Sequence, residues 1–181
     1  THTTTMPLIK DGDVFIYTHK AGLLAAAGHE HRFKMEKFEI NADFDAGTVN
    51  AKFWVESVEV AGAYRNGNRD DVDMDALSDD NKEQVYGQFT GDLLDSSNFP
   101  YVTFEGTLAA AGDGFTATGQ LEMRGQKKDL TFNIAKDGSN LKGEVELVPS
   151  QWGVPLPFSA MLGAMKVADK VELTFSVPDP R

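Results

Sequence analysis

The sequence predicts a mainly β fold, a single antiparallel β-barrel of about eight strands with one helix and a short helical turn. Apolar and polar residues alternate in short runs over most of the 181 residues, which is the period of a strand with one buried face. Glycine turns separate these runs, and one stretch alone has a clear helical period. An up-and-down barrel of this size has no exposed edges and can hold one slender ligand.

Residues 101–134 are expected to form three consecutive strands joined by glycine turns. Their apolar faces are Val102, Phe104 and Leu108, then Phe115, Ala117, Gly119, Leu121 and Met123, then Leu130, Phe132 and Ile134. Gly106 and Gly119 also lie on the inward face, where a crowded core does not need glycine. The pattern therefore indicates room inside the barrel.

Further strands are predicted upstream. Residues 8–20 are typical of a hairpin with its turn at residues 11–13, and residues 21–28 favour a short helix. A strand then begins near His29, and its apolar phase changes between Met35 and Phe38, which a β-bulge would explain. Residues 49–55 alternate as a half-buried strand.

An acid-rich stretch, residues 66–80, precedes the predicted helix. It is interpreted as a solvated loop, because the glycine and glutamate of a calcium loop do not fall into register. The helix is expected from Ser78 to Asp95 with Ser78 or Asp80 as its cap. Its apolar residues recur at intervals of four, at Val85, Phe89 and Leu93.

The C-terminal part adds strands at residues 141–147 and 171–177. Between them, residues 151–165 are expected to form a loop or lid with the short helical turn at residues 159–162, because the nearby prolines interrupt a regular strand. The domain prediction is a linker or expression remnant at residues 1–6, one barrel domain over residues 7–178 and a tail at residues 179–181.

Composition excludes several classes of function. The formal net charge is −11 with no run of basic residues, which argues against a nucleic-acid partner and against docking on anionic lipid. The absence of cysteine excludes disulfides and thiolate metal sites. No segment reaches the ~20 apolar residues of a transmembrane helix, so no stable membrane insertion is expected. The chain start lacks a charged-then-apolar leader pattern, as it also would after removal of a signal.

Two segments carry a family resemblance. Residues 98–104, NFPYVTF, and residues 119–132, GQLEMRGQKKDLTF, resemble the central strand and hairpin of the YceI-like, polyisoprenoid-binding, lipocalin-like family. Gln126, Lys127 and Asp129 replace residues that the family often carries in this hairpin. The later segments SQWGV (150–154) and VADKVEL (167–173) are similar to the family's closing segments. Arg69-Asp70 matches only the start of a further family motif, because no histidine follows.

The resemblance implies a lipocalin-like barrel that binds a polyisoprenoid lipid, such as a polyprenyl phosphate or ubiquinone, in a periplasmic or secreted setting. It implies storage or transport, with no cofactor beyond this ligand, and leaves a homodimer open. Loops at residues 21–31 and 152–165 would gate access. The candidate lining is Phe33, Phe53, Val55, Phe104, Leu121, Met123, Phe132 and Val145, with Trp152, Phe158, Met161, Leu162 and Met165 near the mouth. The same residues would also suit a filled core, as in a non-catalytic interaction module.

Three histidines leave an alternative open. His29 and His31 share one strand face, and His19 lies on the preceding strand, so a head-group contact and a zinc or copper site are both compatible with the sequence. The metal hypothesis is the weaker one, because His-x-His lacks a third fixed ligand. No nucleophile motif, phosphate loop or dinucleotide fingerprint is present. We therefore expect a binding protein and not an enzyme.

Overall fold

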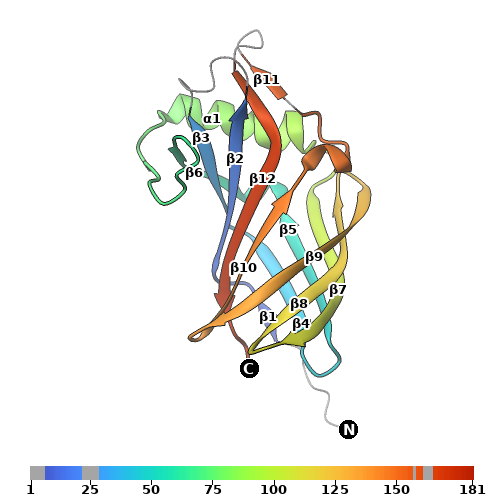
Figure 1. The fold of residues 1–181 in the computed structure, drawn as a ribbon. Helices are drawn as coiled ribbons and strands as arrows, with labels where there is room; N and C mark the ends of the chain where they lie inside the picture. The colour runs from blue at the N-terminus through green and yellow to red at the C-terminus, as the bar shows by residue number, and fades with distance from the viewer. Residues whose placement is uncertain (1–6, 22–28, 157, 161–164) are drawn as a thin grey trace.

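The computed structural model describes residues 7–21, 29–156, 158–160 and 165–181, and these form one long, curled antiparallel sheet with a helix at one end (Figure 1). Eleven strands follow the order β1-β4-β5-β7-β8-β9-β10-β12-β2-β3-β6, and β11 pairs with β12 beside this path. The strands are β1 (Leu8–Ile9), β2 (Asp13–Ala21), β3 (Glu30–Met35), β4 (Phe38–Asp43), β5 (Thr48–Trp54), β6 (Val58–Tyr64), β7 (Tyr101–Ala111), β8 (Gly114–Met123), β9 (Gln126–Asp137), β10 (Asn140–Leu147), β11 (Phe158–Ala160) and β12 (Met165–Pro178).

The sheet has more strands than the eight that the sequence predicts, and it is open. Its path runs from β1 to β6, and no ladder joins β6 to β1 or β4 among the described residues. At residues 36–37, where the sequence predicts a bulge, β3 ends and β4 begins, although the backbone N–H of Glu36 still donates to Ser57 at 3.2 Å and the oxygen of Lys37 accepts from Trp54 at 3.1 Å. β3 lies next to one edge strand of the sheet and β4 next to the other. The fold is a half-barrel and not a closed barrel.

The first strands also pair differently from the prediction. The expected hairpin over residues 8–20 is wrong, because β1 pairs with β4 through Leu8–Asn41 and Ile9–Ile40. β2 lies between β12 and β3. The predicted helix at residues 21–28 falls almost wholly outside the described residues, and Ala21 ends β2.

The three central strands are confirmed as β7, β8 and β9, which pair in sequence order. Gly106 and Gly119 face each other in the β7–β8 ladder. A Cβ on Gly119 would lie 2.1 Å from the carbonyl oxygen of Glu105 and 2.5 Å from the Cα of Gly106. The two glycines therefore allow these strands to approach closely where the sheet curls.

The predicted helix is also confirmed. α1 (Asp79–Gly87) begins after Ser78, whose hydroxyl accepts a hydrogen bond from the backbone N–H of Asn81 at 3.3 Å. The helix continues as the π-helix η3 (Gln88–Leu93), which buries Phe89 and Leu93. Figure 1 shows α1 crossing the end of the half-barrel opposite the C-terminus, which we call the upper end.

Three short elements were not predicted correctly. Ser159 and Ala160, expected in a helical turn, belong instead to β11, and the rest of that turn lies outside the described residues. Pairing with residues Met165–Val167 of β12 gives β11 its backbone hydrogen bonds, which a sequence pattern does not reveal. Single 3-10 turns occur at η2 (Val55–Ser57) and η4 (Pro149–Trp152).

The buried residues form two hydrophobic clusters along the inside of the half-barrel. One includes Phe33, Met35, Phe38 and Phe89, and joins the edge strands to η3. The other includes Phe104, Leu121, Leu147 and Trp152, and joins the central strands to η4. Between these clusters the inward side chains leave space.

Candidate functional site

A lower cavity of about 140 Å³ lies inside the half-barrel. Inward positions of β4, β5, β7, β9, β10 and β12 line it, and none of its lining residues is charged. At its lower end Phe44 packs against Phe115 with ring centroids 5.1 Å apart, and the guanidinium of Arg181 lies 4.8 Å from the Phe44 ring. These side chains cover the lower end of the cavity. We call this cavity the lower chamber.

An upper chamber of about 120 Å³ adjoins it towards η3 and η4. Phe89 and Leu93 of η3, together with Val154 and Leu156 beyond η4, form part of its wall. Thr18 is the one polar residue among its lining side chains within the described part of the chain. Apolar cavities of this kind stay dry and favour apolar guests.

Both chambers share five lining residues: Val14, Phe53, Leu121, Leu147 and Leu173. These side chains come from β2, β5, β8, β10 and β12, and they encircle the level where one chamber meets the other. We call them the waist. A slender apolar chain that passes the waist would occupy both chambers along the length of the half-barrel.

Seven of the eight residues predicted to line the barrel wall border these chambers. Phe53, Phe104, Leu121, Phe132 and Val145 line the lower chamber, and Phe53, Val55, Leu121 and Met123 line the upper one. The sequence analysis missed Val14, Leu147 and Leu173 of the waist. The alternation in the sequence could have identified two of them, because Leu147 lies on the same strand face as Val145, and Leu173 on the same face as Val171.

Two predicted residues lie behind the chamber wall instead. Phe33 is 2% exposed and stacks on Phe89 with ring centroids 4.3 Å apart. Trp152 is equally buried, and its indole Nε1 donates a hydrogen bond to the backbone oxygen of Leu121 at 2.8 Å. The side chains of Phe158 and Met165, and residues Met161 and Leu162 entirely, lie outside the described part of the chain.

Neither predicted histidine lines a chamber. Nε2 of His29 lies 2.8 Å from a guanidinium nitrogen of Arg65 on the loop after β6. Burial, aided by the charge of His29, lowers the pKa of His31 to about 4. At neutral pH His31 is therefore uncharged.

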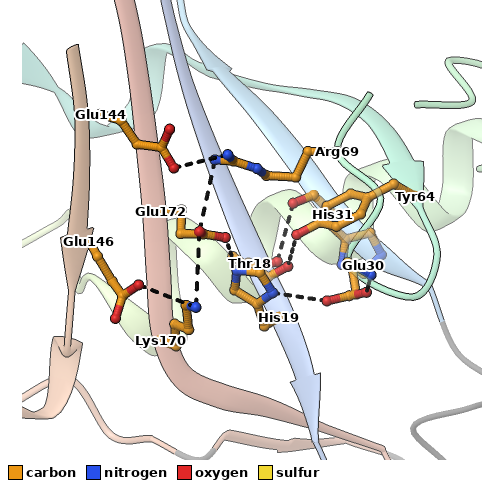
Figure 2. A network of polar contacts seen from close by, with 11 residues as sticks. Thr18, His19, Glu30, His31, Tyr64, Arg69, Glu144, Glu146, Lys170 and Glu172 are labelled. Atoms are coloured by element: carbon orange, nitrogen blue, oxygen red, sulfur yellow. Dashed lines mark hydrogen bonds and ion pairs between the residues drawn. The ribbon is translucent and has the colours of Figure 1, made fainter. Parts of the chain in front are cut away.

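The third histidine, His19, belongs to a buried polar network (Figure 2). Nδ1 of His19 lies 3.0 Å from one carboxylate, on Glu30, and Nε2 lies 2.6 Å from another, on Glu172. Glu30 also accepts a hydrogen bond from the backbone N–H of Gly67 at 2.7 Å. The network thus joins β2, β3 and β12 to the loop between β6 and α1.

Arg69 extends this network along the same loop. Its guanidinium contacts Glu144 at 2.9 Å and Glu172 at 4.0 Å, and it lies 5.1 Å from the Tyr17 ring centroid. Tyr64 donates its hydroxyl to the backbone oxygen of Thr18 at 2.8 Å. Burial next to Glu30 and Glu172 raises the pKa of this phenol far above its ordinary value.

This network lies on the outer face of the sheet. Val14, Ile16 and Thr18 of β2 line the chambers, so Tyr17 and His19 point the other way. The loop after β6, which the sequence predicts to be solvated, is fixed across this outer face by Arg69 and by an antiparallel bridge between Ala63 and Asp73. The network supports the wall of the site but does not reach its interior.

The geometry gives no support to the metal alternative. No group of three or more histidine, aspartate or glutamate side chains in the described ranges is arranged to hold a metal ion. Each ring nitrogen of His19 already contacts a carboxylate, and Nε2 of His29 already contacts the guanidinium of Arg65. No helix among the described residues is long and apolar enough to cross a membrane.

The fold and its chambers define this protein as an antiparallel half-barrel with an uncharged, apolar interior. The sequence profile of the YceI-like domain matches residues 14–178, and the chain belongs to the YceI-like family.

Two solved structures are similar in fold. The crystal structure of BcnA from Burkholderia cenocepacia gives a TM-score of 0.63 at 18% identity and covers 93% of this chain and 98% of its own. The structure of a polyisoprenoid binding domain from Saccharophagus degradans, implicated in plant cell wall breakdown, gives a TM-score of 0.59 at 10% identity. The match covers 96% of this chain and 97% of that domain. Among curated proteins none matches this chain.

Proposed function

We propose that this protein binds a long-chain polyisoprenoid lipid, such as a polyprenyl phosphate or a ubiquinone-like quinone, and stores or carries it without chemical change. The observation that carries the proposal is the pair of apolar chambers that meet at one waist. Membership of the YceI-like family and the fold shared with a polyisoprenoid binding domain support it. A periplasmic or secreted setting, where a lipid needs a carrier between membranes, is part of the proposal.

The tail supplies the affinity in this mechanism. At about 0.8 kcal/mol for each buried methylene-sized group, three isoprene units of five carbons correspond to about 12 kcal/mol before the cost of ordering. Without the cost of ordering this value would correspond to nanomolar binding, and each further isoprene unit adds about 4 kcal/mol to offset that cost. The chambers therefore need no charged anchor for the head group, in agreement with their uncharged lining.

The orientation of the ligand follows from the two ends of the half-barrel. Phe44, Phe115 and Arg181 cover the lower end, whereas the upper chamber reaches Leu156, within the predicted gate segment 152–165, and Val167 just after it. We place the tail through the waist into the lower chamber and the head group at the upper end.

Organic extraction of the purified protein, followed by mass spectrometry of the released lipid, tests the proposal. A stoichiometric polyprenyl species is the expected result, and it would identify the tail and the head group together. Protein stripped of lipid should take up added ubiquinone or polyprenyl phosphate. Failure of both experiments would reject the carrier function and favour an interaction module with a filled interior.

A further inference from the structure

An aromatic pair lies on the outer face of the sheet at the upper end of β5 and β7. Trp54 and Tyr101 stand directly opposite each other in the β5–β7 ladder. Their rings meet edge to face, with centroids 5.6 Å apart. Tyr101 is 41% exposed, one of the few large apolar side chains of the described residues with such exposure.

Two lysines cover these rings. Nζ of Lys52 lies 3.9 Å from the Tyr101 ring centroid and 4.9 Å from that of Trp54, and Nζ of Lys37 lies 4.5 Å from the Trp54 ring centroid. These cation–π contacts place the two ammonium groups on the faces of the rings. We call Lys37, Lys52, Trp54 and Tyr101 the aromatic–lysine patch.

Three acidic residues that flank the patch contact lysines outside it. Glu39 stands opposite Lys52 in the β4–β5 ladder, and a carboxylate oxygen of Glu39 lies 3.1 Å from Nζ of Lys10. Glu36, next to Lys37, lies 3.4 Å from Nζ of Lys34, and Glu122 lies 3.5 Å from Nζ of Lys127. Lys37 and Lys52 form no ion pair within the described residues, so the patch carries local positive charge on a chain whose formal net charge is −11. The net charge of the whole chain does not reveal a local surface of this kind.

We propose that the aromatic–lysine patch docks this protein on the surface of a membrane that contains anionic lipid. Tryptophan and tyrosine are the residues enriched where a bilayer meets water, and each lysine near an anionic leaflet adds attraction to phosphate. The patch is a sheet face and not a groove, which suits a broad, fluid partner. Its geometry assigns it a lipid surface, independently of what the chambers hold.

The position of the patch gives docking a consequence for the interior. Phe53, Val55 and Val102 are the chain neighbours of Trp54 and Tyr101, and they point the other way into the upper chamber. Docking would therefore hold the wall of the upper chamber against the bilayer. A lipid tail would then exchange over a short distance.

The two tryptophans of the chain provide a direct test. Trp152 is 2% exposed and hydrogen-bonded in the core, so a brominated lipid should quench Trp54 alone. We expect quenching with vesicles of phosphatidylglycerol and phosphatidylcholine, relief of quenching by salt, and none with pure phosphatidylcholine. Trp54→Phe should abolish the quenching while vesicle sedimentation still reports binding.

Charge-removal variants test the role of the lysines. Lys37→Gln with Lys52→Gln should lower the vesicle partition coefficient at least tenfold. Lys136→Gln with Lys142→Gln removes the same charge from β9 and β10, where the lysines contact Asp179 and Asp137, and should change it less than twofold. The proposal is overturned if the wild-type protein ignores anionic vesicles, if both double variants lose binding equally, or if Trp152 accounts for the quenching.

Discussion

His19 and Glu172 form a close contact on the outer face of the half-barrel, with Nε2 of the imidazole 2.6 Å from a carboxylate oxygen. Nδ1 faces Glu30 on the other side at 3.0 Å. His19 thus lies between the carboxylates of Glu30 and Glu172, and it ties β2 to both of its neighbouring strands.

Replacing His19 should destabilise the fold. In His19→Ala both Glu30 and Glu172 lose the partner that compensates their burial, and we expect a loss of about 2 kcal/mol in the free energy of unfolding. Urea denaturation at neutral pH measures it. Glu144→Gln removes a carboxylate that is 55% exposed, and it should cost less than about 0.5 kcal/mol.

A double-mutant cycle checks whether the two residues act together. Glu172→Gln in the His19→Ala background should cost less than it does in the wild type, because the contact between Glu172 and His19 is already lost. We expect a coupling of about 1 kcal/mol. Strict additivity of the two substitutions would show that this contact contributes nothing to stability.

His31 should make stability depend on pH. Its folded-state pKa of about 4 lies below the ordinary value because burial disfavours the imidazolium. As the pH falls, the unfolded chain takes up this proton first, so the contribution is full above about pH 6.5 and is lost progressively towards pH 4. At pH 5 the loss is about 2 kcal/mol.

Denaturation of His31→Gln at pH 7 and pH 5 measures this effect. The variant should lose less stability than the wild type over this interval, because it lacks the titrating group. His29→Gln is the comparison, since His29 is more exposed and its pKa is lowered less. An unchanged pH slope in His31→Gln would contradict the assigned burial effect.

Two glycine-to-alanine substitutions should change stability in opposite directions. In Gly119→Ala the new Cβ would meet the carbonyl oxygen of Glu105 at 2.1 Å, and the shift of the strands should cost about 2 kcal/mol. In Gly87→Ala the Cβ meets nothing within 4 Å in helical backbone, so stability should rise by about 0.5–1 kcal/mol. Thermal unfolding compares them, and equal effects would refute this account of the glycine pair.

Enlarging a waist residue should separate the two chambers. Leu173→Phe adds volume where both chambers meet, and uptake of a long polyprenyl tail should fall at least tenfold. Leu108→Phe narrows the lower chamber alone, so it should shorten the tail that co-purifies without preventing binding. Mass spectrometry of lipid extracted from each variant distinguishes the outcomes. Identical lipid profiles would show that the tail does not pass the waist.

Local patterns predicted the parts of this fold that depend on near neighbours in the chain. Alternation placed β7, β8 and β9 correctly, and Ser78 marked the start of α1 because its hydroxyl reaches Asn81 three residues later. Seven of the eight residues predicted to line the barrel wall border a chamber, since alternation fixes which face of a strand a side chain occupies. Leu147 and Leu173 were missed although the same rule applies to them.

The histidines show where such reasoning fails. The sequence analysis selected His29 and His31 because they are two residues apart, yet the close contacts with two carboxylates belong to His19. Its partners come from β3 and β12, and Glu172 is far along the chain. No local pattern shows which carboxylates a folded chain brings to one side chain.

By itself the sequence determined that this is an antiparallel β protein with one capped helix and an apolar inward face, because propensity, alternation and capping act within a few residues. The tertiary structure alone decided that the sheet stays open, that β1 pairs with β4, that two chambers meet at Leu173, and that Trp54 meets Tyr101. Each of these results depends on how distant strands pair and how strongly the sheet curls. Those quantities are set by packing over the whole chain.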